Sequence, residues 1–235
     1  MKQPHSTALY PHPFSAAYWR DAAGELKNTK MLVIAALLVA LRVALKSLAI
    51  PVAADLKINI AFFVNALGAA IFGPVVAAVA AAVSDTLGCI LFPQGAYFFP
   101  FIFIEIAGSV IFALYFYRAK ITTTRVILSR FCIDFFVNIV LNTPIMVLYY
   151  HVMLGKSYNI LHWPRIIKNL VLFPLESVLL TLFLSALLPL ARKMQLVYDD
   201  GKDLRLGKRQ IVLLAALFIV GSACVVGYLF YKGIL

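Results

Sequence analysis

The stretch SRFCIDFFVNIVLNTPIMVLYY (residues 129–150) decides the fold, because it sets a polar stripe into a segment that is otherwise apolar. Its polar members, Arg130, Asp134, Asn138 and Asn142, follow one another at intervals of four residues. In a helix this spacing drifts by only about 40° per step, so all four side chains project from one side. Exposure of each group to lipid would destabilise the folded protein by about several kcal/mol. The stretch therefore predicts a membrane helix whose polar side faces a protein interior or a wet cavity.

The stripe has two interpretations. Polar side chains at membrane depth mark binding sites by default, which favours a cavity lined by Asn138 and Asn142. Arg130 and Asp134 can instead neutralise each other at i,i+4 and serve only helix packing. We therefore assign the two amides to a candidate site and leave the role of the charged pair open.

The composition of the whole chain places it in the same class. Of its 235 residues, 63% are hydrophobic and 13% are charged, whereas a soluble domain has about 45–50% apolar and about 25% charged residues. The fold class is therefore all-α, a polytopic transmembrane helical bundle. The net charge of +11 does not indicate a nucleic-acid partner, since the basic residues cluster between apolar spans and so report orientation in the membrane.

Seven hydrophobic spans are long enough to cross the membrane or to lie buried within it. They cover 31–49, 58–72, 74–92, 97–117, 126–150, 165–191 and 210–231, with a Gly-Pro break between the second and third. The chain thus divides into a polar tail at 1–30, a six-helix membrane core at 31–193, a basic linker at 194–209 and an additional transmembrane helix at 210–235. An interfacial helix within 10–27 is the alternative to a plain tail.

The distribution of Lys and Arg orients the bundle. With the N-terminus in the cytoplasm, the inner segments hold fourteen of these residues and the outer loops hold three. This bias predicts a multi-pass protein of the cell membrane with a cytoplasmic N-terminus and a cytoplasmic tail at 1–30.

The outer half of the bundle is then rich in aromatic and amide groups, with two cations at the start of the sixth span. A pocket of this kind suits a flat, anionic small molecule. The candidate substrate-binding residues are Asn59, Tyr97, Asn138, Asn142, Tyr149, Arg165 and Lys168. For the aromatic residues the alternative is an ordinary interfacial belt. For Arg165 and Lys168 the alternative is that their side chains snorkel towards the outer lipid headgroups.

The first span carries a stripe of small residues, Ala36, Ala40 and Ala44. Small residues at every fourth position let helices approach closely, either within the bundle or against a partner subunit. Arg42 lies near the middle of the same span and needs a partner that the sequence does not identify.

No catalytic motif is present in the sequence. It contains no H-E-x-x-H, C-x-x-C or G-x-S-x-G pattern. Asp85 and Glu105 are best interpreted as structural anchors, because nothing in the sequence brings them together. We therefore expect no catalytic residues, no metal site and no cofactor bound by this chain.

Several features together resemble a known family: the small-residue first helix, a second span that ends in FGP (72–74), the pair Ser84-Asp85, and the run DFFVNIVLNT (134–143). Over about residues 31–193 the chain is similar to the S components of energy-coupling factor (ECF) vitamin transporters, and most similar to their folate-specific members. The resemblance implies a six-helix subunit that binds a vitamin, here folate, from outside. It also implies as partners a membrane-embedded coupling protein and two cytosolic ABC ATPases, which bind the ATP. In the family the alanine stripe docks the coupling protein, a role that falls on Ala36, Ala40 and its continuation Ala44. The seventh span and the N-terminal segment depart from the six-helix pattern.

Other functions remain open at this point. The chain could be an S component for riboflavin, pantothenate or a queuosine precursor. It could be an ion-coupled secondary transporter in which Asp85, Glu105, Asp134 and Glu176 relay protons, although no inverted repeat is detectable. It could also be a membrane scaffold without a ligand.

Overall fold

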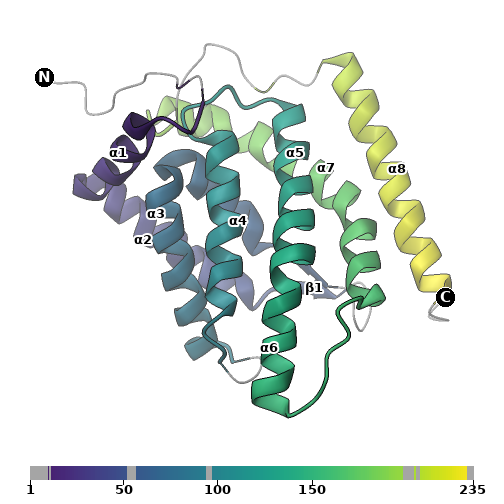
Figure 1. Cartoon of the computed structure of the whole chain (residues 1–235). Coiled ribbons are helices and arrows are strands. Elements are labelled where there is room, and N and C mark those ends of the chain that lie inside the picture. The colour runs from purple at the N-terminus through teal and green to yellow at the C-terminus, as the bar shows by residue number, and fades with distance from the viewer. Residues whose placement is uncertain are drawn as a thin grey trace, which may run out of the picture.

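The computed structural model describes residues 10, 12–51, 57–93, 97–197, 204 and 207–231, which form a bundle of helices with one short hairpin (Figure 1). The helices are α1 (Ala16–Gly24), the 3-10 turn η1 (Glu25–Lys27), α2 (Thr29–Lys46), α3 (Ala61–Leu91), α4 (Phe101–Phe116), α5 (Thr123–Cys132), the π-helix η2 (Ile133–Leu141), α6 (Asn142–Leu154), α7 (Trp163–Lys193) and α8 (Lys208–Tyr231). Two antiparallel strands, β1 (Ala49–Pro51) and β2 (Lys57–Asn59), join α2 to α3. The predicted helical bundle is confirmed, but the second span begins at Ala61 rather than at 58, because residues 57–59 pair with β1.

Helix α3 contains the second and third predicted spans. Its backbone leaves the helical conformation at Gly73, where φ is +77°, and Pro74 follows. A positive φ is accessible to glycine without strain, and proline cannot donate the next hydrogen bond of the helix. The ring of Tyr117 lies so close that a Cβ at Gly73 would approach it to 2.9 Å. The predicted Gly-Pro break is confirmed.

The predicted fifth span is one continuous helical segment of 32 residues, formed by α5, η2 and α6. Its middle third, η2, is π-helical. A π-helix has more residues per turn than an α-helix, which offsets the drift of a four-residue spacing. The π-helical stretch therefore keeps the polar stripe of this segment on one side.

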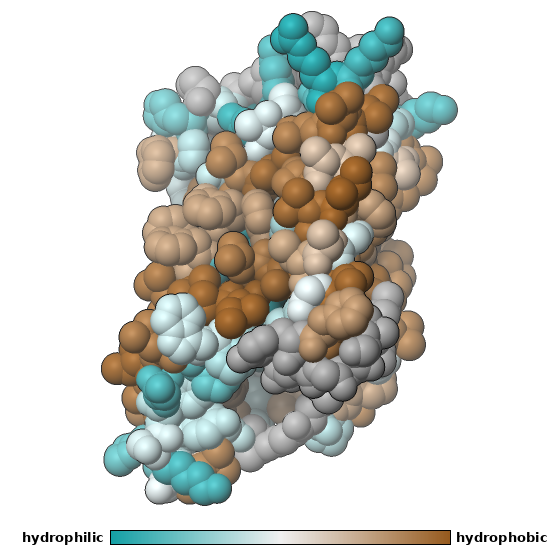
Figure 2. Space-filling model, turned by 90° about the vertical axis from the view of Figure 1, so that its right-hand side faces the viewer, coloured by the Kyte–Doolittle hydropathy of each residue, from teal (hydrophilic) through white to brown (hydrophobic). Residues whose placement is uncertain are grey.

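Four of the described helical segments are long and apolar enough to cross a membrane: α3, the α5–α6 segment, α7 and α8. Helix α4 is shorter but apolar, and α2 is bent by 86° from the α1–η1 segment. On the face drawn in Figure 2, hydrophobic residues gather in a broad band across the middle, with hydrophilic residues towards its upper and lower edges. The exposed apolar side chains of α8, among them Ile211, Phe218 and Ile219, match such a band. This surface suits a lipid environment.

The segment before the first span is not a plain tail, and that prediction is wrong for residues 10–27. Ser15 caps α1, and the buried Tyr18 donates a hydrogen bond of 3.0 Å to a backbone carbonyl near the end of α4. Asp21 accepts hydrogen bonds from Tyr10 and Arg118, and these bonds hold the pKa of its carboxyl below the usual range. Of the charged residues that indicated a solvated tail, Asp21 and Glu25 instead pair with Arg118, just after the end of α4. Residues 198–203 and 205–206 of the predicted linker lie outside the described residues.

Candidate functional site

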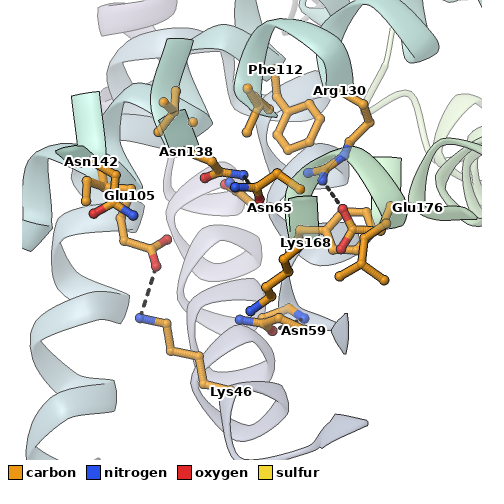
Figure 3. A pocket seen from close by; sticks show the side chains of 18 of the residues that line it. Lys46, Asn59, Asn65, Glu105, Phe112, Arg130, Asn138, Asn142, Lys168 and Glu176 are labelled. Carbon is orange, nitrogen blue, oxygen red and sulfur yellow. Dashed lines mark hydrogen bonds and ion pairs between the residues drawn. The ribbon is translucent and has the colours of Figure 1, made fainter. Parts of the chain in front are cut away.

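A cavity of about 350 Å³ lies among α2, α3, α4, the α5–α6 segment and α7 (Figure 3). It is lined by five of the seven candidate residues, namely Asn59, Asn138, Asn142, Arg165 and Lys168. The first and last of these lie more than a hundred positions apart in the sequence, and the bundle brings all five together. We call this space the central cavity.

The other two candidates, Tyr97 and Tyr149, line a second space of about 460 Å³. Both spaces are lined by Lys46, Asn59 and Glu105, so they adjoin. We call the second space the aromatic cavity. Together they form one site, whose central part is mostly polar and whose second part adds aromatic side chains.

The aromatic cavity has a wall of packed rings. The ring of Tyr149 meets those of Phe98 and Phe101, with centroid distances of 5.4 Å and 5.5 Å. All three residues line the cavity. Such a wall offers stacking surface to a flat aromatic ligand.

The polar stripe of the α5–α6 segment contributes to both of the roles considered for it. Arg130 pairs with Asp134 at 3.1 Å and also with Glu176 of α7, while Asn138 donates a hydrogen bond of 2.9 Å to Asp134. The guanidinium carbon of Arg130 lies 4.7 Å from the ring centre of Phe62. The charged pair therefore does neutralise itself at i,i+4, yet Arg130 and Glu176 also line the central cavity (Figure 3).

Sequence reasoning did not identify the partner of Arg42. In the structure Arg42 pairs with Glu105 and donates a hydrogen bond of 3.2 Å to Asn65. Lys46, one turn further along α2, bridges Asp85 at 2.7 Å and Glu105 at 3.5 Å. The anchoring role predicted for the two carboxylates agrees with these ion pairs. The signal in the sequence was the spacing of Arg42 and Lys46, which puts both cations on one face of a helix.

Two cations of the central cavity differ from the others. Arg42, Lys46 and Arg130 pair with carboxylates, whereas among the described residues Arg165 and Lys168 have no carboxylate within ion-pair distance. The guanidinium of Arg165 donates to Thr143, but its buried Nε and Nη1 atoms have no hydrogen-bond partner in the described part of the chain.

The buried Oδ1 atom of Asn142 is unpaired in the same way. Buried polar groups are normally satisfied, so unpaired ones that line a cavity are free to bond water or a bound molecule. Arg165 and Lys168, without a carboxylate partner among the described residues, make the cavity suited to an anionic molecule.

The alanine stripe lies on the opposite side of α2 from this site. Ala36, Ala40 and Ala44 are exposed, whereas Arg42 and Val43 of the same helix are buried. The described bundle therefore does not use the stripe for its own packing. This leaves the stripe accessible to a partner helix.

Comparisons with known proteins relate the chain to transporter subunits. The family model described as "ECF-type riboflavin transporter, S component" matches residues 26–188. A protein named "Folate transporter FolT" from Clostridium novyi (strain NT) is 32% identical over 125 residues, which are 53% of this chain and 70% of that protein. Another of the same name, from Leuconostoc mesenteroides subsp. mesenteroides, is 31% identical over 151 residues, 63% of this chain and 81% of that protein.

A solved structure described as "Crystal structure of FolT bound with folic acid" superposes with a TM-score of 0.56. The two sequences are 30% identical, and the matched region covers 64% of this chain and 89% of the solved one.

Proposed function

Because the chain belongs to the S components of ECF transporters, we propose that it binds folate and delivers it for uptake. Family membership confirms the resemblance found in the sequence and makes the protein a multi-pass membrane subunit of a transporter. The family model names riboflavin, whereas both relatives and the solved structure are named for folate. The choice between these vitamins depends on the chemistry of the central cavity.

The observation that carries the proposal is that Arg165 and Lys168 line the cavity without a carboxylate partner in the described part of the chain. Folate ends in a glutamate with two carboxylates at neutral pH, whereas riboflavin is an uncharged molecule. A carboxylate placed beside these cations forms charge-assisted hydrogen bonds, which are roughly twice as strong as neutral ones. A neutral ligand can accept hydrogen bonds from the guanidinium through its oxygens, but it would leave the positive charge of Arg165 and Lys168 without a counter-charge.

The joined cavities also offer different surroundings to the two ends of the ligand. With the glutamate beside Arg165 and Lys168, the pterin extends past Asn59 into the aromatic cavity, where Tyr97 and Tyr149 lie. The amides of the stripe on the α5–α6 segment line the central cavity and can bond the linking amide. Each of the seven candidate residues then contacts one part of the same molecule.

Transport requires partners. In this proposal a membrane-embedded coupling protein docks on the exposed stripe Ala36, Ala40 and Ala44, and two cytosolic ABC ATPases bind the ATP. The N-terminus is cytoplasmic and the site opens outward, as the excess of Lys and Arg at the inner ends of the spans favours.

The proton-relay alternative loses support in the structure. All four carboxylates considered for the relay, Asp85, Glu105, Asp134 and Glu176, pair with arginine or lysine side chains. These ion pairs join helices of the bundle, so the four carboxylates are accounted for as structural partners of Arg42, Lys46 and Arg130. An S component needs no such relay, since its partners hydrolyse ATP.

A thermal-shift experiment tests the proposal. The purified chain in detergent is heated with folic acid, a reduced folate, riboflavin, pantothenate or a queuosine precursor. Binding to the folded state stabilises it by about 4 kcal/mol at a thousand-fold excess over Kd. We expect the folates alone to raise Tm. A rise in Tm with another vitamin instead would identify that vitamin as the substrate. No rise with any of them, in protein shown to be folded, would favour a membrane scaffold without a ligand.

A further inference from the structure

Helix α8 lies antiparallel beside α7 and contacts the bundle mainly through it (Figure 1). Its buried residues Leu214, Gly221 and Tyr228 follow one another at intervals of seven, while most of its other side chains are exposed. A seven-residue repeat marks one face of a helix. The predicted seventh helix thus presents one stripe to α7, and the remaining question is what this contact does.

The first close contact is between Gly221 and a weak point of α7. A Cβ built on Gly221 would lie 3.1 Å from the backbone nitrogen of Leu175 and 3.3 Å from the Cβ of Pro174. Pro174 lies inside α7 and cannot donate the hydrogen bond that would continue the helix. Glycine here lets the backbone of α8 support α7 where α7 lacks one of its own bonds.

The second contact reaches the wall of the ligand site. Tyr228 packs against Leu172, and both side chains are buried. Leu172 also lines the central cavity. Four residues to either side of it on α7 lie Lys168 and Glu176, which point into the same space in Figure 3. Tyr228 therefore supports the wall of the cavity from behind.

Both contacts, at Leu172 and at Pro174, follow directly after the part of α7 that carries Arg165 and Lys168. Arg165 and Lys168 lie in the outer half of α7, before Pro174. A helix interrupted by proline bends easily at that point. Without support from outside, this half would have more freedom to move relative to Glu176 and the other cavity walls.

We propose that α8 positions the outer half of α7 for ligand binding, with Gly221 and Tyr228 as the positioning residues. Neither residue touches the ligand. They act through Pro174 and Leu172, which hold the two unpaired cations of α7 opposite the ligand's carboxylates. This inference rests on the proposed folate site and gives a function to α8, the helix that is additional to the six-helix core.

The test compares Gly221→Leu with Gly227→Leu in the full chain. Gly227 lies on the same helix, is exposed, and a Cβ there meets no atom within 4 Å. Dissociation constants are measured for folic acid and for pteroic acid, which keeps the pterin but lacks the glutamate. We expect Gly221→Leu to weaken folic acid binding about tenfold, because the cations lose their preorganised position. Pteroic acid binding should change less than about threefold, and Gly227→Leu should leave both constants unchanged.

Each outcome has a distinct meaning. Equal constants for Gly221→Leu and wild type, or an equal loss for both ligands, would overturn the positioning role. If Gly221→Leu does not fold, Tyr228→Leu provides the same comparison, because it shortens the contact with Leu172. If the wild-type chain binds neither ligand, the proposed function itself fails and this inference with it.

Discussion

Replacing Arg165 by glutamine is the most informative single change in the site. Two of its guanidinium nitrogens, Nε and Nη1, are buried without a partner among the described residues, and the third donates to Thr143. In the ligand-free protein these two nitrogens are a cost, since a buried unsatisfied polar group destabilises by about 1–3 kcal/mol. Arg165→Gln should therefore leave the Tm of the ligand-free protein unchanged or raise it.

The effect on binding has the opposite sign. A hydrogen bond to a charged group contributes about 1.5–3 kcal/mol. If the two ligand carboxylates accept one hydrogen bond from each of the free nitrogens, the loss is at least about 3 kcal/mol, which is roughly a hundred-fold in Kd. The shorter glutamine side chain keeps only a neutral donor in place of the guanidinium.

This loss of affinity is measured by equilibrium titration with folic acid at low salt, with the intrinsic fluorescence of the protein as the signal. Lys156→Gln is the matched control, because it removes a positive charge from an exposed residue outside the cavity. A change in Kd of less than about threefold for Arg165→Gln would show that no ligand carboxylate pairs with these nitrogens. An equal loss of affinity in Lys156→Gln would also contradict direct pairing, because the loss would then come from weaker long-range attraction between the protein and the anionic ligand.

Three further predictions concern stability and coupling. Gly73→Ala should lower Tm, because φ is +77° and the new Cβ would lie 2.9 Å from an aromatic ring; Gly24→Ala, where no atom lies within 4 Å, should not. Arg130→Met leaves two buried carboxylates without their arginine and should cost about 3–5 kcal/mol in a denaturation experiment; an unchanged midpoint would contradict the pairing. Ala40→Leu should abolish folate uptake by cells that contain the coupling module while Kd stays unchanged, and a loss of binding would argue against docking.

Much of the bundle could be predicted because lipid makes polar groups costly. The spans, the break at Gly73 and the single-sided stripe that starts at Arg130 all follow from that cost and from helix geometry. Depth within the membrane was enough to select five residues that line one cavity. The π-helical stretch was not predictable, because it changes the hydrogen-bond register without a signature in composition.

Contacts between distant segments could not be predicted from one sequence. Arg42 and Glu105 are 63 positions apart, and their pairing depends on how two helices rotate against each other. The helix given as the alternative for residues 10–27 was not preferred for a similar reason, because Asp21 finds its arginine, Arg118, 97 positions away. A short segment with mixed charge is predicted to be exposed to solvent unless the oppositely charged partners of its side chains are known. Pairing across the bundle is thus what the structure adds.

Binding of folate at one site in this chain is tested most directly by isothermal titration of the purified protein. Folic acid and riboflavin are titrated separately into the same preparation. We predict saturable binding of one folic acid per chain and no heat of binding with riboflavin. Saturable binding of riboflavin, with no heat of binding from folic acid, would contradict the assignment of folate as the ligand.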